Sequence, residues 1–146
     1  MDLGEMVVRS FIRIIERYNM QVSIICENEV ILFTDKYILS FLYHSAELEM
    51  IYFEKRETGV LFQYNIDSFI SCSISEEDRK HIKERLKNST KTERELEMLA
   101  YTLENKWDNL LSGGTEWMEI YQNYMLYVPA RDVTSVIEKR YMGRSF

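Results

Sequence analysis

The chain lacks the features that usually divide a protein or send it to a membrane. One proline and five glycines in 146 residues leave no Pro/Gly-rich linker between modules. No apolar run is long enough to span a bilayer, and the N-terminus lacks the pattern of a secretory signal. We therefore expect one cytoplasmic domain, residues 1–146, with helix and sheet in 1–74 and a helical section in 75–146.

Residues for metal, cofactor and nucleophile chemistry are scarce as well. The two cysteines and two histidines have neither paired-cysteine nor His-Glu-x-x-His spacing. The glycine pair Gly113-Gly114 lacks the Gly-Lys-Ser/Thr of a phosphate-binding loop, and no Gly-x-Ser-x-Gly segment marks a nucleophile. We therefore expect no metal site and no cofactor.

The chain also lacks an excess of positive charge. Its formal net charge is −6, and the best basic stripe, Arg79, Lys83 and Lys87, is interleaved with carboxylates. Attraction to nucleic acid depends on clustered Lys and Arg that replace counterions, so we expect no nucleic acid partner and no membrane partner. The charge favours a basic protein partner instead.

What the chain does have is a dense apolar and aromatic belt from Val22 to Ile74. Turn-forming residues interrupt it at Glu27-Asn28, Thr34-Asp35, Ser45-Ala46 and Glu57-Thr58-Gly59. The short β-branched and aromatic runs between these breaks predict an antiparallel meander of about five strands.

Neither face of these predicted strands is cleanly polar. From Tyr37, one face carries Leu39 and Phe41 while the other carries Ile38 and Leu42. A sheet with one solvated face would alternate more strictly. We expect the N-terminal helix to cover one face and the C-terminal helices the other; alternatively, an uncovered apolar face could form a homodimer.

Helical periodicity marks both ends of the chain. Apolar residues recur at helical spacing from Leu3 to Tyr18, which predicts an amphipathic N-terminal helix. After Ile74, capping residues and apolar stripes predict helices that start near Ser75, Thr92 and Thr115, followed by a last short helix through Val133, Val136, Ile137 and Tyr141. Helix, strands and then helices indicate an α+β fold with the C-terminal section packed on the sheet.

Two functional alternatives concern the sheet itself. A small acid/base enzyme would use His44 with a nearby carboxylate, Glu47, Glu49 or Asp67, if these side chains meet in a pocket. A small-ligand protein would enclose an apolar cavity between helix and sheet. Its predicted lining is Phe41, Tyr43, Tyr52, Phe62 and Tyr64.

The leading hypothesis is a non-enzymatic module that binds a protein and occludes it. Carboxylates and aromatic residues are interspersed through the C-terminal half, where rings can supply anchor area and charges can select a basic partner. The candidate contact residues are Glu97, Glu104, Asp108, Trp117, Glu119, Tyr121, Tyr124 and Tyr127, and core packing is the competing explanation for the aromatic ones.

In general character, a small acidic α+β chain without catalytic motifs is similar to the immunity proteins of bacterial toxin systems. Those proteins neutralise basic toxin domains by occlusion. The likeness is one of class, in charge, size and the lack of catalytic motifs, and it implies a basic protein partner.

Overall fold

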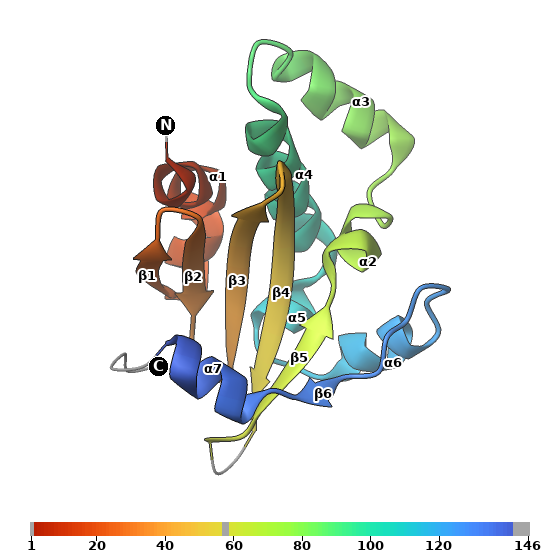
Figure 1. Ribbon diagram of the computed structural model, residues 1–146. Coiled ribbons are helices and arrows are strands. Elements are labelled where there is room, and N and C mark those ends of the chain that lie inside the picture. Colours follow the sequence, from red (N-terminus) through yellow and green to blue (C-terminus); the bar gives the residue numbers. More distant parts are fainter. Residues whose placement is uncertain (1, 57–58, 142–146) are drawn as a thin grey trace.

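The computed structural model describes residues 2–56 and 59–141 and has an α+β fold built on one six-stranded antiparallel sheet (Figure 1). The strands follow each other in space as they do in sequence. They are β1 (Gln21–Cys26), β2 (Glu29–Phe33), β3 (Tyr37–His44), β4 (Glu47–Lys55), β5 (Leu61–Asn65) and β6 (Arg131–Asp132).

The described part of the chain contains seven helices. They are α1 (Leu3–Arg17), α2 (Asp67–Ser71), α3 (Glu76–Arg85), α4 (Lys91–Lys106), α5 (Asp108–Leu111), α6 (Glu116–Gln122) and α7 (Thr134–Arg140). The predicted order of N-terminal helix, meander and C-terminal helices is therefore confirmed.

Tight turns produce the meander where the sequence predicts breaks. The β3–β4 hairpin turns at Ser45 and Ala46, which both have positive φ, as a two-residue turn with the twist of the strands requires. The break predicted at Glu57-Thr58-Gly59 falls partly on residues 57 and 58, outside the described residues. The sixth strand, β6, was not predicted; it returns from the helical section and pairs Arg131 with Gln63.

One face of the sheet carries the main core. α1, α4, α5 and α6 all pack on this face, so the expectation that α1 and the C-terminal helices lie on opposite faces is wrong. α1 and α4 contact each other directly. The strand residues of this core are Val30, Leu32, Tyr37, Leu39, Phe41, Met50, Tyr52 and Tyr64.

Aromatic rings join the C-terminal section to this face. Trp117 of α6 packs edge-to-face on Tyr52 and Tyr64, with ring centroids 4.9 and 5.3 Å away. The polar atoms of Trp117 and Tyr121 are both paired, because Trp117 Nε1 donates to the Gly114 carbonyl and Tyr121 Oη donates to the Asn65 carbonyl. Such satisfied aromatic groups combine a large buried area with a defined orientation.

The opposite face of the sheet is covered over its lower half by α7, which crosses in front of β3 and β4 in Figure 1. Val133 and Ile137 pack there against a smaller apolar cluster that includes Ile31, Ile38 and Phe53. The predicted apolar stripe of this helix is only partly correct, because Val136 lies on its exposed side.

A buried carboxylate holds α7 on this face. Glu29 of β2 is only 3% exposed, and it accepts hydrogen bonds from Tyr141 Oη at 2.7 Å and Ser40 Oγ at 3.2 Å. The Arg140 guanidinium neutralises it, with Nε and Nη2 each 3.0 Å from Glu29 Oε1. Burial, together with the hydrogen bond to Glu29, raises the pKa of Tyr141.

Two local predictions need correction. The capping box lies at Thr90 and Glu93 and not at Thr92, because the Thr90 hydroxyl accepts the Glu93 N–H. The stripe from Leu96 to Leu111 is divided at Trp107 into α4 and α5, and α2 was not predicted at all.

We expect Tyr141→Phe to lower the free energy of unfolding by roughly 1.5–3 kcal/mol, because Glu29 then loses a buried hydrogen bond to its charge. Urea denaturation followed by circular dichroism measures this change. Tyr43→Phe is the matched control, since the Tyr43 hydroxyl makes no hydrogen bond with the described residues. Equal effects of the two substitutions would contradict the role of Glu29 in holding α7.

Candidate functional site

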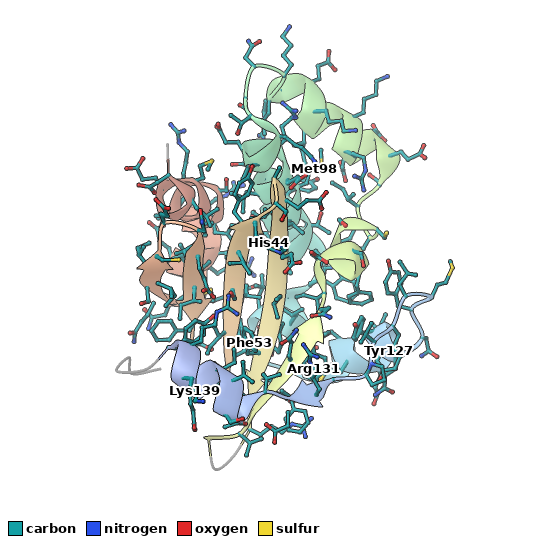
Figure 2. The ribbon with its side chains drawn as sticks, viewed as in Figure 1. His44, Phe53, Met98, Tyr127, Arg131 and Lys139 are labelled. Atoms are coloured by element: carbon teal, nitrogen blue, oxygen red, sulfur yellow. The ribbon has the colours of Figure 1, made fainter. Side chains whose placement is uncertain are left out.

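The upper half of the α7 face is open, and it carries the residues considered for acid/base chemistry (Figure 2). His44 ends β3 and Glu49 lies on β4, and His44 Nε2 is 3.0 Å from Glu49 Oε1. Their side chains are 51% and 43% exposed. The structure thus brings these two residues together, as the enzyme alternative requires, but on a surface that water reaches from the open side.

The other two predicted carboxylates lie on either side of this pair. Glu47 is the register partner of His44 and is exposed on the β3–β4 hairpin. Asp67 begins α2 and accepts the Ser68 N–H at 2.8 Å. Burial raises the pKa of the Asp67 carboxyl, and the nearby charge of Glu49 acts in the same direction.

A shallow pocket of about 380 Å³ lies between Asp67 and β4 and β5. Asp67, Glu49, Gln63 and Asn65 supply its polar lining. The pocket offers acceptors for a cationic group more readily than a site for proton transfer, because His44 does not line it. Within the residues described, no group of three or more His, Cys, Asp and Glu side chains is arranged to hold a metal ion.

The predicted aromatic contact residues lie mostly inside the protein. Trp117 and Tyr121 are each 1% exposed and belong to the core, so the folded chain does not present their rings to a partner. Tyr124 and Tyr127 are partly buried; Tyr124 packs edge-to-face on Phe69, and Tyr127 does so on Tyr121. Core packing therefore accounts for these rings.

The predicted acidic residues are largely neutralised within the chain. Glu97 pairs with Arg85, Glu104 pairs with Arg13, and Asp108 lies 3.9 Å from Arg17. Asp108 also accepts the Tyr18 hydroxyl, and burial together with this hydrogen bond raises the pKa of Tyr18 to about 12. Glu119 of α6 differs, because it is exposed and has no ion pair with any described residue.

A second exposed surface was missed by the sequence reasoning. Ile120, Met125, Leu126 and Val128 are 55, 92, 62 and 48% exposed, and we call these four residues the apolar corner. They lie at the end of α6 and in the turn before β6, near Tyr127 in Figure 2. The signal in the sequence was the apolar run from Met125 to Val128. A run of this kind is typical of a core segment, so the pattern alone does not indicate that it is exposed.

The apolar corner is held in place by the core beneath it. The Tyr121 hydroxyl accepts the Val128 N–H and lies within hydrogen-bonding distance of the Val128 carbonyl, both at 3.3 Å. The Tyr127 N–H donates to the Tyr124 carbonyl and closes the turn. Tyr124 Oη in turn lies 3.5 Å from Cys72 Sγ, so the turn also contacts the end of α2.

The space between helix and sheet that an apolar ligand would occupy is filled. Phe41 and Tyr52 are almost fully buried, and the Phe11 ring of α1 packs on Phe41 at 4.9 Å. Tyr52 is likewise in ring contact with Tyr37 at 5.0 Å. The five predicted lining residues thus contribute to the packed interior, and the geometry offers no support for the ligand alternative.

The comparisons with known proteins add no relative. The chain matches no protein-family model, no curated protein and no solved structure. Among the described helices, none combines the length and the apolar composition needed to cross a membrane.

We expect Asp67→Asn to reduce the dependence of stability on pH. Because burial raises the pKa of Asp67 above its ordinary value of 3.8, the folded chain binds this proton more tightly than the unfolded chain. The free energy of unfolding therefore falls as pH rises through this range, and the loss persists at neutral pH. Asn removes the titration but keeps the acceptor for the Ser68 N–H.

The measurement is urea denaturation at several pH values between about 4 and 7, a range that extends upward from the ordinary pKa of an aspartate. Asp35→Asn removes an exposed carboxylate and serves as the matched control. If Asp67→Asn unfolded more readily than the parent at pH 7, the account of Asp67 as a buried, destabilised charge would be wrong.

Proposed function

We propose that this chain is a protein-binding module that occludes a basic partner, with the apolar corner as the centre of its contact surface. The observation that carries the proposal is the concentration of four exposed aliphatic side chains within nine residues. Single exposed apolar residues are normal, whereas a contiguous group of them on a folded chain marks an interaction surface.

The corner is suited to binding because its backbone is already ordered. The Val128 N–H donates a hydrogen bond to the Tyr121 hydroxyl, and the Tyr127 ring packs on the Tyr121 ring with centroids 5.1 Å apart. The turn would therefore lose little conformational entropy when a partner binds. A surface that is already ordered binds more tightly than a flexible one that makes the same contacts. Met125, the most exposed of the four, has a flexible side chain that adapts to an irregular partner surface.

Carboxylates around the corner supply the preference for a basic partner. Glu119 directly precedes Ile120 on α6 and Glu116 lies one turn earlier, and neither has an ion pair with a described residue. On the side of α2, the hydrogen bond to Cys72 raises the pKa of Tyr124, and the negative charge of Asp67 acts in the same direction. An apolar centre with an acidic rim, on a chain of net charge −6, steers a cationic protein towards it.

Occlusion by such a surface is the mode of action of the immunity proteins that this chain resembles in general character. A partner whose functional site faces the corner would be blocked without any chemistry on this chain. The proposal therefore assigns His44 and Glu49 no catalytic role.

We expect the double substitution Met125→Asp and Leu126→Asp to weaken partner binding at least tenfold, because two charges would replace apolar anchors at the centre of the contact. Affinity capture from the native source, with proteins identified by mass spectrometry, finds the partner. Calorimetric titration with the purified partner then measures the change in affinity. Affinity for the parent chain should also fall as salt concentration rises.

The matched control is Val136→Asp, which places a charge at an equally exposed aliphatic position on α7, away from the corner. Both variants should unfold at temperatures close to that of the parent, because the replaced side chains are exposed. Two results would refute the proposal. One is a partner that binds the parent, the double variant and Val136→Asp with equal affinity; the other is that no captured protein is lost when the apolar corner is substituted.

A further inference from the structure

An apolar groove of about 670 Å³ lies between α1 and β1, on the face of the sheet that carries the main core. Val22 and Ile24 of β1 form its floor, and both side chains are exposed. Val8 of α1 lines the wall, and Ile12, one turn later on the same side of α1, is exposed as well. Gly4 lets α1 approach the floor closely, because a Cβ at that position would lie 2.6 Å from Ile24 Cδ1.

Carboxylates gather at the end of the groove where α1 begins. Asp2 and Glu5 line it from the side of α1, and Glu27 lines it from the turn after β1. Asp2 Oδ1 accepts the Glu5 N–H at 2.8 Å as the helix cap, but none of the three carboxylates has an ion pair with a described residue. Arg9 is the cation among the described lining residues. The groove therefore combines an apolar floor with an excess of negative charge at its rim.

The helices on this face show where a further helix would fit. α1 lies mainly over β2, α4 contacts β4, and the two helices contact each other directly. Two strand spacings are about 10 Å, which matches the roughly 8–10 Å between the axes of packed helices. The same step on the other side of α1 leads to a position just outside β1. A helix there would contact Val8 from one side and would lie against Val22 and Ile24.

We propose that a basic amphipathic helix of a partner protein binds in this groove, side by side with α1. Apolar residues on one side of that helix contact Val8, Val22 and Ile24, which is the usual mode of helix-in-groove recognition. Its Lys and Arg residues face the carboxylates at the end of the groove. The contact is made by side chains and needs no hydrogen bond from the edge of β1.

Charge distinguishes this occupant from a second copy of the chain. The chain has a formal net charge of −6, so a second copy would bring further negative charge to an acidic groove. A cationic helix instead places positive charge beside carboxylates that have no ion pair with a described residue. The groove is separate from the apolar corner, and docking there does not depend on the function proposed for the corner.

Two designed peptides test the groove on the full chain. One peptide of about 15 residues combines Leu and Lys so that the Leu residues lie on one side of a helix, and the other has Glu in place of every Lys. Fluorescence anisotropy of the labelled peptides measures both affinities. We expect the Leu/Lys peptide to bind about tenfold or more tightly than the Leu/Glu peptide, and to bind more weakly as the salt concentration rises.

A substitution in the floor tests the position of the site. Ile24→Lys should weaken binding of the Leu/Lys peptide about tenfold or more, because it replaces an apolar contact with a like charge. Val136→Lys makes the same change of charge at an exposed aliphatic position on α7 and should leave the affinity nearly unchanged. Circular dichroism confirms that each variant is folded.

A second pair of variants separates the rim of the groove from the net charge of the chain. Glu5→Lys combined with Glu27→Lys should weaken binding of the Leu/Lys peptide about tenfold or more at low salt. Glu76→Lys combined with Glu77→Lys changes the net charge equally, at exposed positions in the first turn of α3. This control should have a much smaller effect.

The two cysteines locate the bound peptide. Cys26 lines the groove, whereas Cys72 lies beside Tyr124 and the apolar corner, and both are exposed. Saturating Leu/Lys peptide should slow the alkylation of Cys26 by iodoacetamide and leave that of Cys72 unchanged, as mass spectrometry of the modified chain measures.

Several results would overturn the proposal. They are equal affinity for the two peptides, binding that Ile24→Lys or the Glu5 and Glu27 substitutions leave unchanged, and protection of Cys72 in place of Cys26. The last result would place the peptide at the apolar corner. Sedimentation equilibrium adds a further check, because a dimer of the parent that Ile24→Lys dissociates would show that a second copy occupies the groove.

Discussion

The packing of Trp117 against Tyr52 and Tyr64 is the interaction on which the rest of the structure depends. It joins α6 to the centre of a sheet whose first five strands all come from the first half of the chain. Tyr52 is almost fully buried, and burial raises its pKa, so the ring lies where water does not reach it. Tyr121 adds a second attachment of α6, because its ring packs on Tyr64 and its hydroxyl donates to the Asn65 carbonyl.

The same packing separates what is core from what is surface in the C-terminal half. Trp117 and Tyr121 point inwards, whereas Ile120, three residues after Trp117, lies at the edge of that buried face and is 55% exposed. The apolar corner therefore borders the buried aromatic residues of α6. A surface built in this way is rigid, because its position is fixed by the core and not by the turn alone.

The sequence was sufficient to predict the class of fold. A period of 3.6 residues marks α1, because one face of this helix is buried, whereas short β-branched and aromatic runs between turn residues mark the strands. It was not sufficient for β6 or α2, whose few residues produce no measurable period. The helices that cover each face of the sheet were also assigned wrongly. α7, and not α1, covers Ile38 and Phe53, and a helix of seven residues gives too short a pattern to show which face it covers.

The candidate site was harder to predict, because the signal for a buried aromatic residue is the same as the signal for an exposed one. Composition alone could not separate Trp117, in the core, from Met125, on the surface. Charge was equally ambiguous, because Glu97 and Glu104 have cationic partners on α3 and α1, far away in sequence. Of the four predicted contact carboxylates, only Glu119 is without an ion pair among the described residues.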